Sequence, residues 1–93
     1  MAKKKSAKKE VRRSILDKPA LEFMERYLNN ASPTGFESGG QRIWLDYLRL
    51  YIDTHFTDPY GTVVGVINPD AKYKVVIEAH ADEISWFVSY ITK

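Results

Sequence analysis

The sequence contains no cysteine and only two histidines. Disulfide bridges and thiolate metal sites are therefore excluded, and histidine, aspartate and glutamate are the only strong metal ligands that the chain offers. No apolar run approaches the roughly 20 residues of a membrane-spanning helix. A signal peptide is also excluded, because Asp17 and Lys18 directly follow the first two large aliphatic residues. We therefore expect a cytoplasmic protein with no membrane partner.

The charges are divided unevenly along the 93 residues, which are enough for one small domain. Residues 1–13 carry seven basic residues and one acidic residue, a net charge of +6, whereas residues 14–93 carry seven basic and eleven acidic residues, a net charge of −4. The N-terminal stretch has too few apolar side chains to bury surface, so we expect residues 1–16 to form a disordered basic tail. Because no aromatic residue is interleaved to stack on bases, nucleic acid is not an expected partner.

Two amphipathic helices are predicted in the first half of the chain. Asp17 or Lys18 is the expected N-cap of the first helix, and this helix should end near residues 29 and 30. Its apolar residues recur at steps of three and four: Ala20, Phe23, Met24, Tyr27 and Leu28. A turn over residues 31–37 separates it from the second helix, for which Ser38 is the expected cap. The apolar side of the second helix is Ile43, Trp44, Tyr47, Leu48, Tyr51 and Ile52.

Two glycines, Gly39 and Gly40, stand near the start of the second helix. Either they allow another part of the backbone to come close, or they only add flexibility, and the sequence leaves both readings open.

Strands are predicted in the second half of the chain. A short strand over residues 56–58 precedes a clear strand over residues 62–67, and a turn at residues 68–71 leads into a strand that begins at residue 72. The strand over residues 62–67 and the strand that begins at residue 72 should pair antiparallel, because a short turn joins them. Residues 84–91 form a further strand with two apolar faces, which needs a covering element. We therefore expect this chain to be the N-terminal portion of a longer protein.

The strand that begins at residue 72 ends in an imidazole and two carboxylates. Side chains alternate along a strand, so His80 and Asp82 should point to the same face. A metal-bound imidazole usually has its second nitrogen held by a carboxylate or a carbonyl, and Asp82 is placed to supply it. A hydrogen-bonded structural histidine is the alternative. The other histidine, His55, has no partner at ligand spacing and is expected to be an ordinary surface or boundary residue.

Three segments, taken in order, resemble the start of the dinuclear metallo-aminopeptidases that assemble as tetrahedral particles, metallopeptidase family forty-two. These segments are Ser32-Pro33-Thr34-Gly35-Phe36-Glu37, Asp58-Pro59-Tyr60-Gly61 and Glu78-Ala79-His80-Ala81-Asp82-Glu83-Ile84. The resemblance runs from about residue 18 to residue 93. Members of the family are classed as glutamyl, leucyl or deblocking aminopeptidases, or as endoglucanase-like proteins.

The resemblance implies an α/β fold, the N-terminal part of a zinc-peptidase-like fold. In it, two helices precede a mixed β-sheet whose central strand carries the His-x-Asp motif. Residues 17–84 would belong to the catalytic domain, and residues 85–93 would begin an inserted β domain. His80 matches the first metal ligand of the family. Asp82 matches the catalytic carboxylate that orients the imidazole and the metal site.

The function implied by the resemblance is that of a metal-dependent aminopeptidase, a hydrolase that removes N-terminal residues from peptide substrates. The complete enzyme would hold two zinc or cobalt ions and form a tetrahedral homo-dodecamer. The other ligands and the general base of the family lie downstream, so the chain alone is expected to be catalytically incomplete. One alternative is a small non-catalytic binding module whose basic tail docks on an anionic or protein partner. Another is a truncated product with no function of its own.

Overall fold

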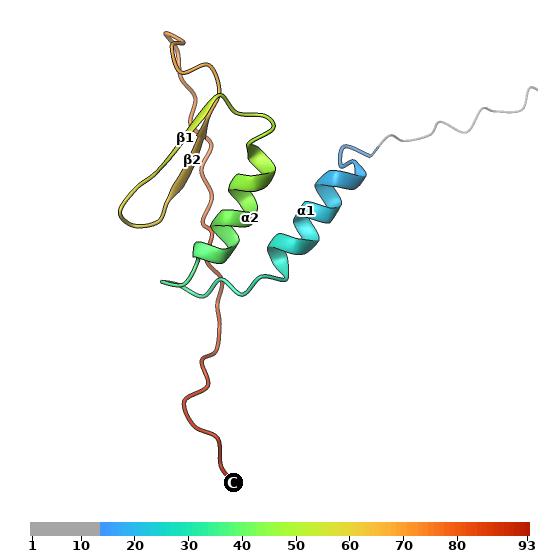
Figure 1. The fold of residues 1–93 in the computed structure, drawn as a ribbon, viewed down its shortest axis with the longest axis vertical. Helices are drawn as coiled ribbons and strands as arrows, with labels where there is room; N and C mark the ends of the chain where they lie inside the picture. Colours follow the sequence, from blue (N-terminus) through green and yellow to red (C-terminus); the bar gives the residue numbers. More distant parts are fainter. Residues whose placement is uncertain (1–13) are drawn as a thin grey trace, which may run out of the picture.

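The computed structural model describes residues 14–93 and consists of two helices followed by a two-stranded antiparallel hairpin (Figure 1). In chain order the elements are α1 (Lys18–Leu28), α2 (Ser38–Leu48), β1 (Thr54–Thr57) and β2 (Val63–Val66). The prediction of a small α/β arrangement with the helices first is therefore confirmed in this coarse form.

Helix α1 begins and ends where the sequence predicts. The Asp17 side chain is the N-cap, with Oδ1 accepting a hydrogen bond from the Ala20 amide at 2.9 Å, and Pro19 lies in the first turn. This cap satisfies one of the amide groups that the first turn leaves without a helical partner. The helix ends at Leu28, and the amide of Asn29 donates to the Glu25 carbonyl at 3.0 Å.

Helix α2 begins differently from the prediction. Glu37 is the N-cap, and Ser38 is already the first helical residue, so the prediction that Ser38 caps this helix is wrong. The reason is local. Glu37 has helical dihedral angles and makes no side-chain cap, because its carboxylate turns back to accept a hydrogen bond from the Gly35 amide at 2.7 Å.

The two helices and the hairpin pack side by side through a few specific contacts. The rings of Phe23 in α1 and Tyr47 in α2 stack with their centroids 4.2 Å apart and their planes at 10°. Helix α2 in turn lies against β2. The side chains of Leu48 and Ile52 lie directly over Gly65 of β2, so closely that a Cβ atom added there would be 3.0 Å from Ile52 Cγ2 and 3.3 Å from Leu48 Cδ1. No hydrophobic side chain among residues 14–93 is fully buried, so these contacts carry much of the packing.

The hairpin pairs Thr54 with Val66 at one end and Thr57 with Val63 at the other. The short strand predicted at residues 56–58 therefore lies slightly earlier, and the strand predicted at residues 62–67 is shortened to Val63–Val66. Its partner also differs from the prediction. We expected it to pair with the strand after residues 68–71, whereas it pairs with the preceding strand, β1.

The turn between β1 and β2 is organised by the Asp58 carboxylate. Its Oδ1 accepts hydrogen bonds from the amides of Tyr60 and Thr62, both at 2.9 Å, while Gly61 takes a positive φ of 86°. These donors, foremost the Thr62 amide, favour the charged carboxylate and hold the pKa of Asp58 below its ordinary value. The turn is therefore tied to the ionised form of this side chain.

Acidification is expected to loosen this turn. Because the folded-state pKa of Asp58 lies below the ordinary value of 3.8, its stabilising contribution is complete above that value and is lost as the pH falls through the lower folded value. The amide resonances of Tyr60 and Thr62, followed by NMR from about pH 6 to about pH 2, should shift with a midpoint below 3.8. The Asp58→Asn variant keeps an acceptor oxygen but has no carboxyl group to titrate, so the Tyr60 and Thr62 amide resonances should stay constant in this variant. A midpoint at or above 3.8 in the unmodified chain would contradict this account.

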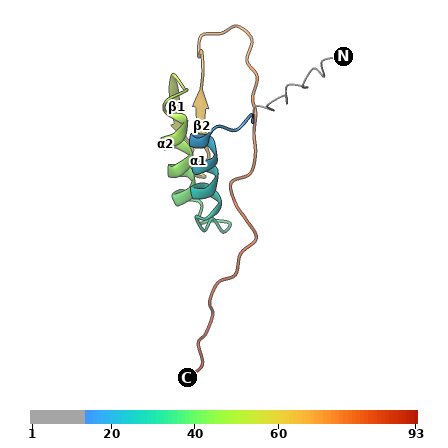
Figure 2. The same ribbon diagram turned by 90° about the vertical axis from the view of Figure 1, so that its right-hand side faces the viewer.

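Residues 72–93 form no strand, and this corrects two predictions. The His-x-Asp strand is not central to a sheet, and residues 84–91 are extended but unpaired; in this part of the structure only Glu83 makes an isolated parallel bridge, with Pro33. The predicted turn at residues 68–71 does form, with Ala71 donating to the Asn68 carbonyl at 3.1 Å. Figures 1 and 2 show the chain beyond it, coloured orange to red, running past the loop between α1 and α2 and then away from both helices.

The strand predictions fail because the described residues supply no layers to cover this segment. Ile77, Ile84 and Trp86 are each at least 95% exposed. Between β2 and residues 73–77 lies an open space of about 400 Å³ in place of a ladder of hydrogen bonds. An apolar strand becomes stable when neighbours pair its backbone and bury its faces, and one short hairpin supplies neither.

Two further findings concern the N-terminal part and the membrane prediction. Most of the predicted basic tail, residues 1–13, lies outside the described residues, whereas residues 14–16 are exposed and belong to no helix or strand. Within the described part of the chain, no helix has the length and apolar character needed to cross a bilayer.

Candidate functional site

The candidate site forms where the loop after α1 meets the extended segment that carries His80. The Glu83 amide donates to the Ser32 carbonyl at 2.9 Å, and the Ser32 amide donates to Glu83 Oε1 at 3.1 Å. These two bonds join positions 51 residues apart in the sequence. Two of the three segments that carry the family resemblance, residues 32–37 and 78–84, are therefore in direct contact.

The His80 ring is held by the residue two positions further along the chain. Its Nδ1 lies 2.9 Å from the Asp82 backbone oxygen and 3.1 Å from Asp82 Oδ1. Because a carbonyl oxygen can only accept, Nδ1 must donate, and in the neutral imidazole the proton is on Nδ1. The lone pair of the neutral ring is then on Nε2. With 85% of its side chain exposed, His80 can offer this nitrogen to a ligand.

The Asp82 carboxylate has a different partner on each oxygen. Oδ1 faces the His80 ring, and Oδ2 accepts a hydrogen bond of 2.6 Å from the Thr34 hydroxyl. The Thr34 bond is the largest cause and lowers the pKa of Asp82; desolvation, the next largest, raises it, and the contact with His80 lowers it again, so that the net shift is downward. The carboxylate is therefore charged at neutral pH, where it can orient a neutral or cationic imidazole.

A small hollow of about 180 Å³ lies beside these residues. One wall comes from the end of α1 and the loop that follows, and the other from the extended segment. The lining residues are Tyr27, Leu28, Asn30, Ser32, His80, Ala81, Asp82 and Glu83. Ser32 is only 6% exposed, and its hydroxyl accepts from Asn30 Nδ2 at 3.2 Å, so the wall on the helix side is held by its own hydrogen bonds.

The residues present fit part of a metal site. His80 offers one ligand nitrogen and Asp82 a carboxylate that fixes the ring, which is the usual arrangement around a metal-bound histidine. Over the described range 14–93, however, no three histidine, aspartate or glutamate side chains gather closely enough to hold an ion. A catalytic zinc needs about three protein ligands. His55, in β1, is exposed, as expected for an ordinary surface residue.

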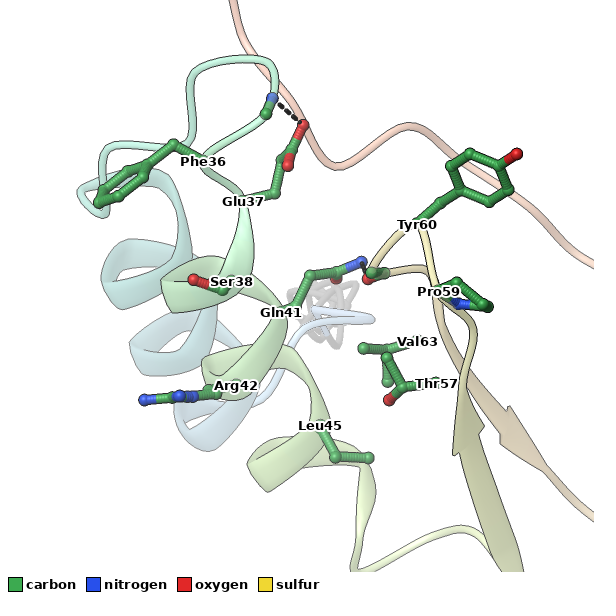
Figure 3. Close-up of a pocket in the computed structure, with 12 residues that line it drawn as sticks. Phe36, Glu37, Ser38, Gln41, Arg42, Leu45, Thr57, Pro59, Tyr60 and Val63 are labelled. Carbon is green, nitrogen blue, oxygen red and sulfur yellow. Dashed lines mark hydrogen bonds between the residues drawn. The ribbon is translucent and has the colours of Figure 1, made fainter.

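A second hollow, of about 410 Å³, lies between the start of α2 and the β1–β2 turn (Figure 3), and no pattern in the sequence predicts it. Gln41 spans it by donating from Nε2 to the Gly61 carbonyl at 3.1 Å. In Figure 3 Arg42 points away from the cavity, and the Glu37 carboxylate is occupied by the Gly35 amide. This hollow therefore lacks a pair of side chains placed for acid–base or metal chemistry.

Sequence reasoning missed Thr34 and Ser32 as parts of the candidate site. Both were interpreted as turn residues, because nothing in their spacing points to partners 48 and 51 residues away. The one available signal was that residues 32–37 and 78–84 both contribute to the same family resemblance.

Comparisons of the chain with protein-family models, with curated proteins and with solved structures found no match. The case for a function therefore rests on the residues of the candidate site and on the three sequence segments that carry the resemblance.

Proposed function

We propose that His80 and Asp82 form part of the metal site of a metal-dependent aminopeptidase. The observation that carries the proposal is the contact of His80 Nδ1 with two acceptor oxygens of Asp82, which leaves Nε2 as the ligand atom. It is supported by the contact between residues 32–37 and 78–84, two segments that resemble this family. The side chain of His80 is 85% exposed, so its Nε2 is accessible to a ligand.

Each residue has a distinct role in this proposal. His80 binds a divalent ion, zinc or cobalt, through Nε2. Asp82 keeps the proton on Nδ1 and fixes the plane of the ring. When bound, the metal ions would supply Lewis-acid chemistry, namely polarisation of the scissile carbonyl of a peptide substrate and activation of water. In the family that these segments resemble, the remaining ligands of the two ions, the general base and the surface for a tetrahedral homo-oligomer lie downstream, so they would have to come from polypeptide outside residues 14–93. The chain alone is then expected to bind zinc weakly and to hydrolyse nothing.

A zinc titration of the whole chain, followed by NMR of the two histidine rings, tests this proposal. We expect the His80 ring to shift on adding Zn²⁺ and the His80→Ala variant to bind at least about tenfold more weakly, because the ligand atom is gone. The matched control is His55→Ala, which removes the other exposed imidazole and should leave zinc binding at His80 unchanged.

Two results would contradict the proposal. One is zinc binding that is equal in the unmodified chain and in His80→Ala, which would show that His80 is not a ligand. The other is hydrolysis of an aminoacyl anilide by the pure chain that disappears in His80→Ala, which would show that the site is complete without further ligands.

A further inference from the structure

We infer that residues 83–93 form a self-association surface, on which the same segment of a second copy of the chain pairs antiparallel, with Val88 of one copy opposite Val88 of the other. The inference goes beyond the proposed function and does not depend on metal binding. Residues 84–92 carry no charged side chain, proline or glycine, and most of them are β-branched or aromatic. An exposed segment of this composition is a template for pairing with further copies of itself.

The backbone and the side chains of this segment are both accessible. No backbone amide or carbonyl of residues 84–93 is hydrogen-bonded to another segment within residues 14–93. Trp86 is 97% exposed and Tyr90 is 81% exposed. Figures 1 and 2 both show the segment running away from the helices and the hairpin toward the C-terminus. A second polypeptide can therefore reach the backbone edges and the aromatic side chains together.

The contact at Glu83 determines which edge of the segment is open from its start. The Glu83 amide donates to the Ser32 carbonyl at 2.9 Å, so this edge faces the loop after α1. Backbone groups of successive residues in an extended chain point to opposite edges, and those of residues 84, 86, 88 and 90 therefore point to the other edge. In a two-fold pair both copies use the same edge. Each even-numbered residue is then hydrogen-bonded opposite an even-numbered residue of the second copy.

Among the registers with this symmetry, the one centred on Val88 is the most self-complementary. It places Trp86 of each copy opposite Tyr90 of the other. It also places Glu83 of each copy opposite Lys93 of the other, at the two ends of the uncharged stretch. Aromatic pairs and pairs of opposite charge directly across two strands both stabilise the pairing. Registers centred one residue earlier or later lose both kinds of pair, so the sequence favours the register centred on Val88.

Sedimentation velocity of the whole chain, from micromolar to near-millimolar concentration, tests the inference. Two paired strands alone are only marginally stable in water, so we expect monomers at the lowest concentration and dimers at the highest. Val88→Lys should need at least about tenfold more protein for the same fraction of dimer, because like charges then lie directly opposite each other. Val88→Glu alone should behave in the same way. An equimolar mixture of these two variants should recover the dimer, because position 88 of one copy faces position 88 of the other.

Ile77→Lys is the matched control. It adds the same charge to a side chain that is 95% exposed and lies outside residues 83–93, and it should leave association unchanged. Unchanged amide resonances in α1 and α2 establish that each variant is folded. The inference would be overturned by a chain that stays monomeric throughout the range, or by equal effects of Val88→Lys and Ile77→Lys. A mixture of the Val88 variants that associates no better than either alone would also overturn it, because position 88 would then not face itself.

Discussion

Replacing Phe23 with alanine is expected to detach α1 from α2 and to unfold most of α1. The stacked pair of Phe23 and Tyr47, 4.2 Å apart, is the closest ring contact between the two helices. Because Phe23 is more buried than exposed but not fully enclosed, its loss should cost about 2–3 kcal/mol, less than for a fully buried phenylalanine. Helix α1 has 11 residues, which is too short to persist in water without a packing partner. Circular dichroism and the α1 amide resonances would measure the loss of helix.

The ionisation of Tyr47 gives an independent readout of the same contact. Desolvation in the packed structure is the main cause that raises the pKa of this phenol above 10.0, with its neighbour Tyr51 adding to it. The folded state holds the proton more tightly, so the stabilisation is complete below pH 10.0 and is lost as the pH rises through the raised value. Phe23→Ala should move the pKa of Tyr47 back toward 10.0.

The control for Phe23 is Leu21→Ala, also in α1, because Leu21 is 50% exposed. Its effect should stay within about 1 kcal/mol. If Phe23→Ala preserved the α1 resonances and the titration of Tyr47, the stacked rings would not be what holds the helices together.

The parts of the fold that sequence predicts are those fixed by near neighbours. Helix α1 is defined by a capping side chain three residues from its partner and by apolar residues at helical spacing, both of which are visible in the sequence. The start of α2 was misplaced by one residue, because Glu37 bonds backward to the Gly35 amide instead of capping forward. Such a choice between two local hydrogen bonds is decided by dihedral angles that the residue types do not specify.

The strands beyond residue 71 were wrong for a different reason. The alternation of apolar residues indicates which face of a strand could be buried. Whether the strand forms depends on backbone pairing with partners that are distant in the sequence. In the described structure β2 is paired with β1, and residues 73–77 lie beside β2 across an open space without pairing to it. The same distinction holds in the candidate site. The contact of His80 with Asp82 follows from a separation of two residues, whereas that of Asp82 with Thr34 spans 48.

The structure also decides between the two readings of the glycines at the start of α2. A Cβ atom added at Gly40 would lie 2.7 Å from Ser32 Oγ, which is closer than such atoms approach, and Ser32 is buried. At Gly39 the nearest atom is Asn30 Oδ1, 3.1 Å away at the tip of a flexible side chain. Gly40 is therefore required for a close approach between α2 and the loop that carries the site, whereas Gly39 is not.

Gly40→Ala is consequently expected to lower the free energy of unfolding, although replacing glycine by alanine within a helix usually raises it. In a helix this substitution ordinarily stabilises by up to about 1 kcal/mol, but here the overlap costs about 1–3 kcal/mol. Displacing Ser32 should also break its pairing with Glu83 and so release the Thr34 loop from Asp82. We expect a lower urea midpoint, together with changed amide resonances of Ser32 and Glu83, whose mutual hydrogen bonds would be lost.

Two further variants make this prediction specific. Gly39→Ala should be neutral or slightly stabilising, because the Asn30 amide can move aside. Combining Gly40→Ala with Ser32→Ala removes the clashing oxygen, so the double variant should be more stable than the sum of the two single effects, by about 1 kcal/mol or more. If Gly40→Ala alone stabilised as much as Gly39→Ala, the close approach would not exist in solution. Coupling in the double variant would instead show that α2, through a residue with no side chain, holds the loop that presents Thr34 to Asp82.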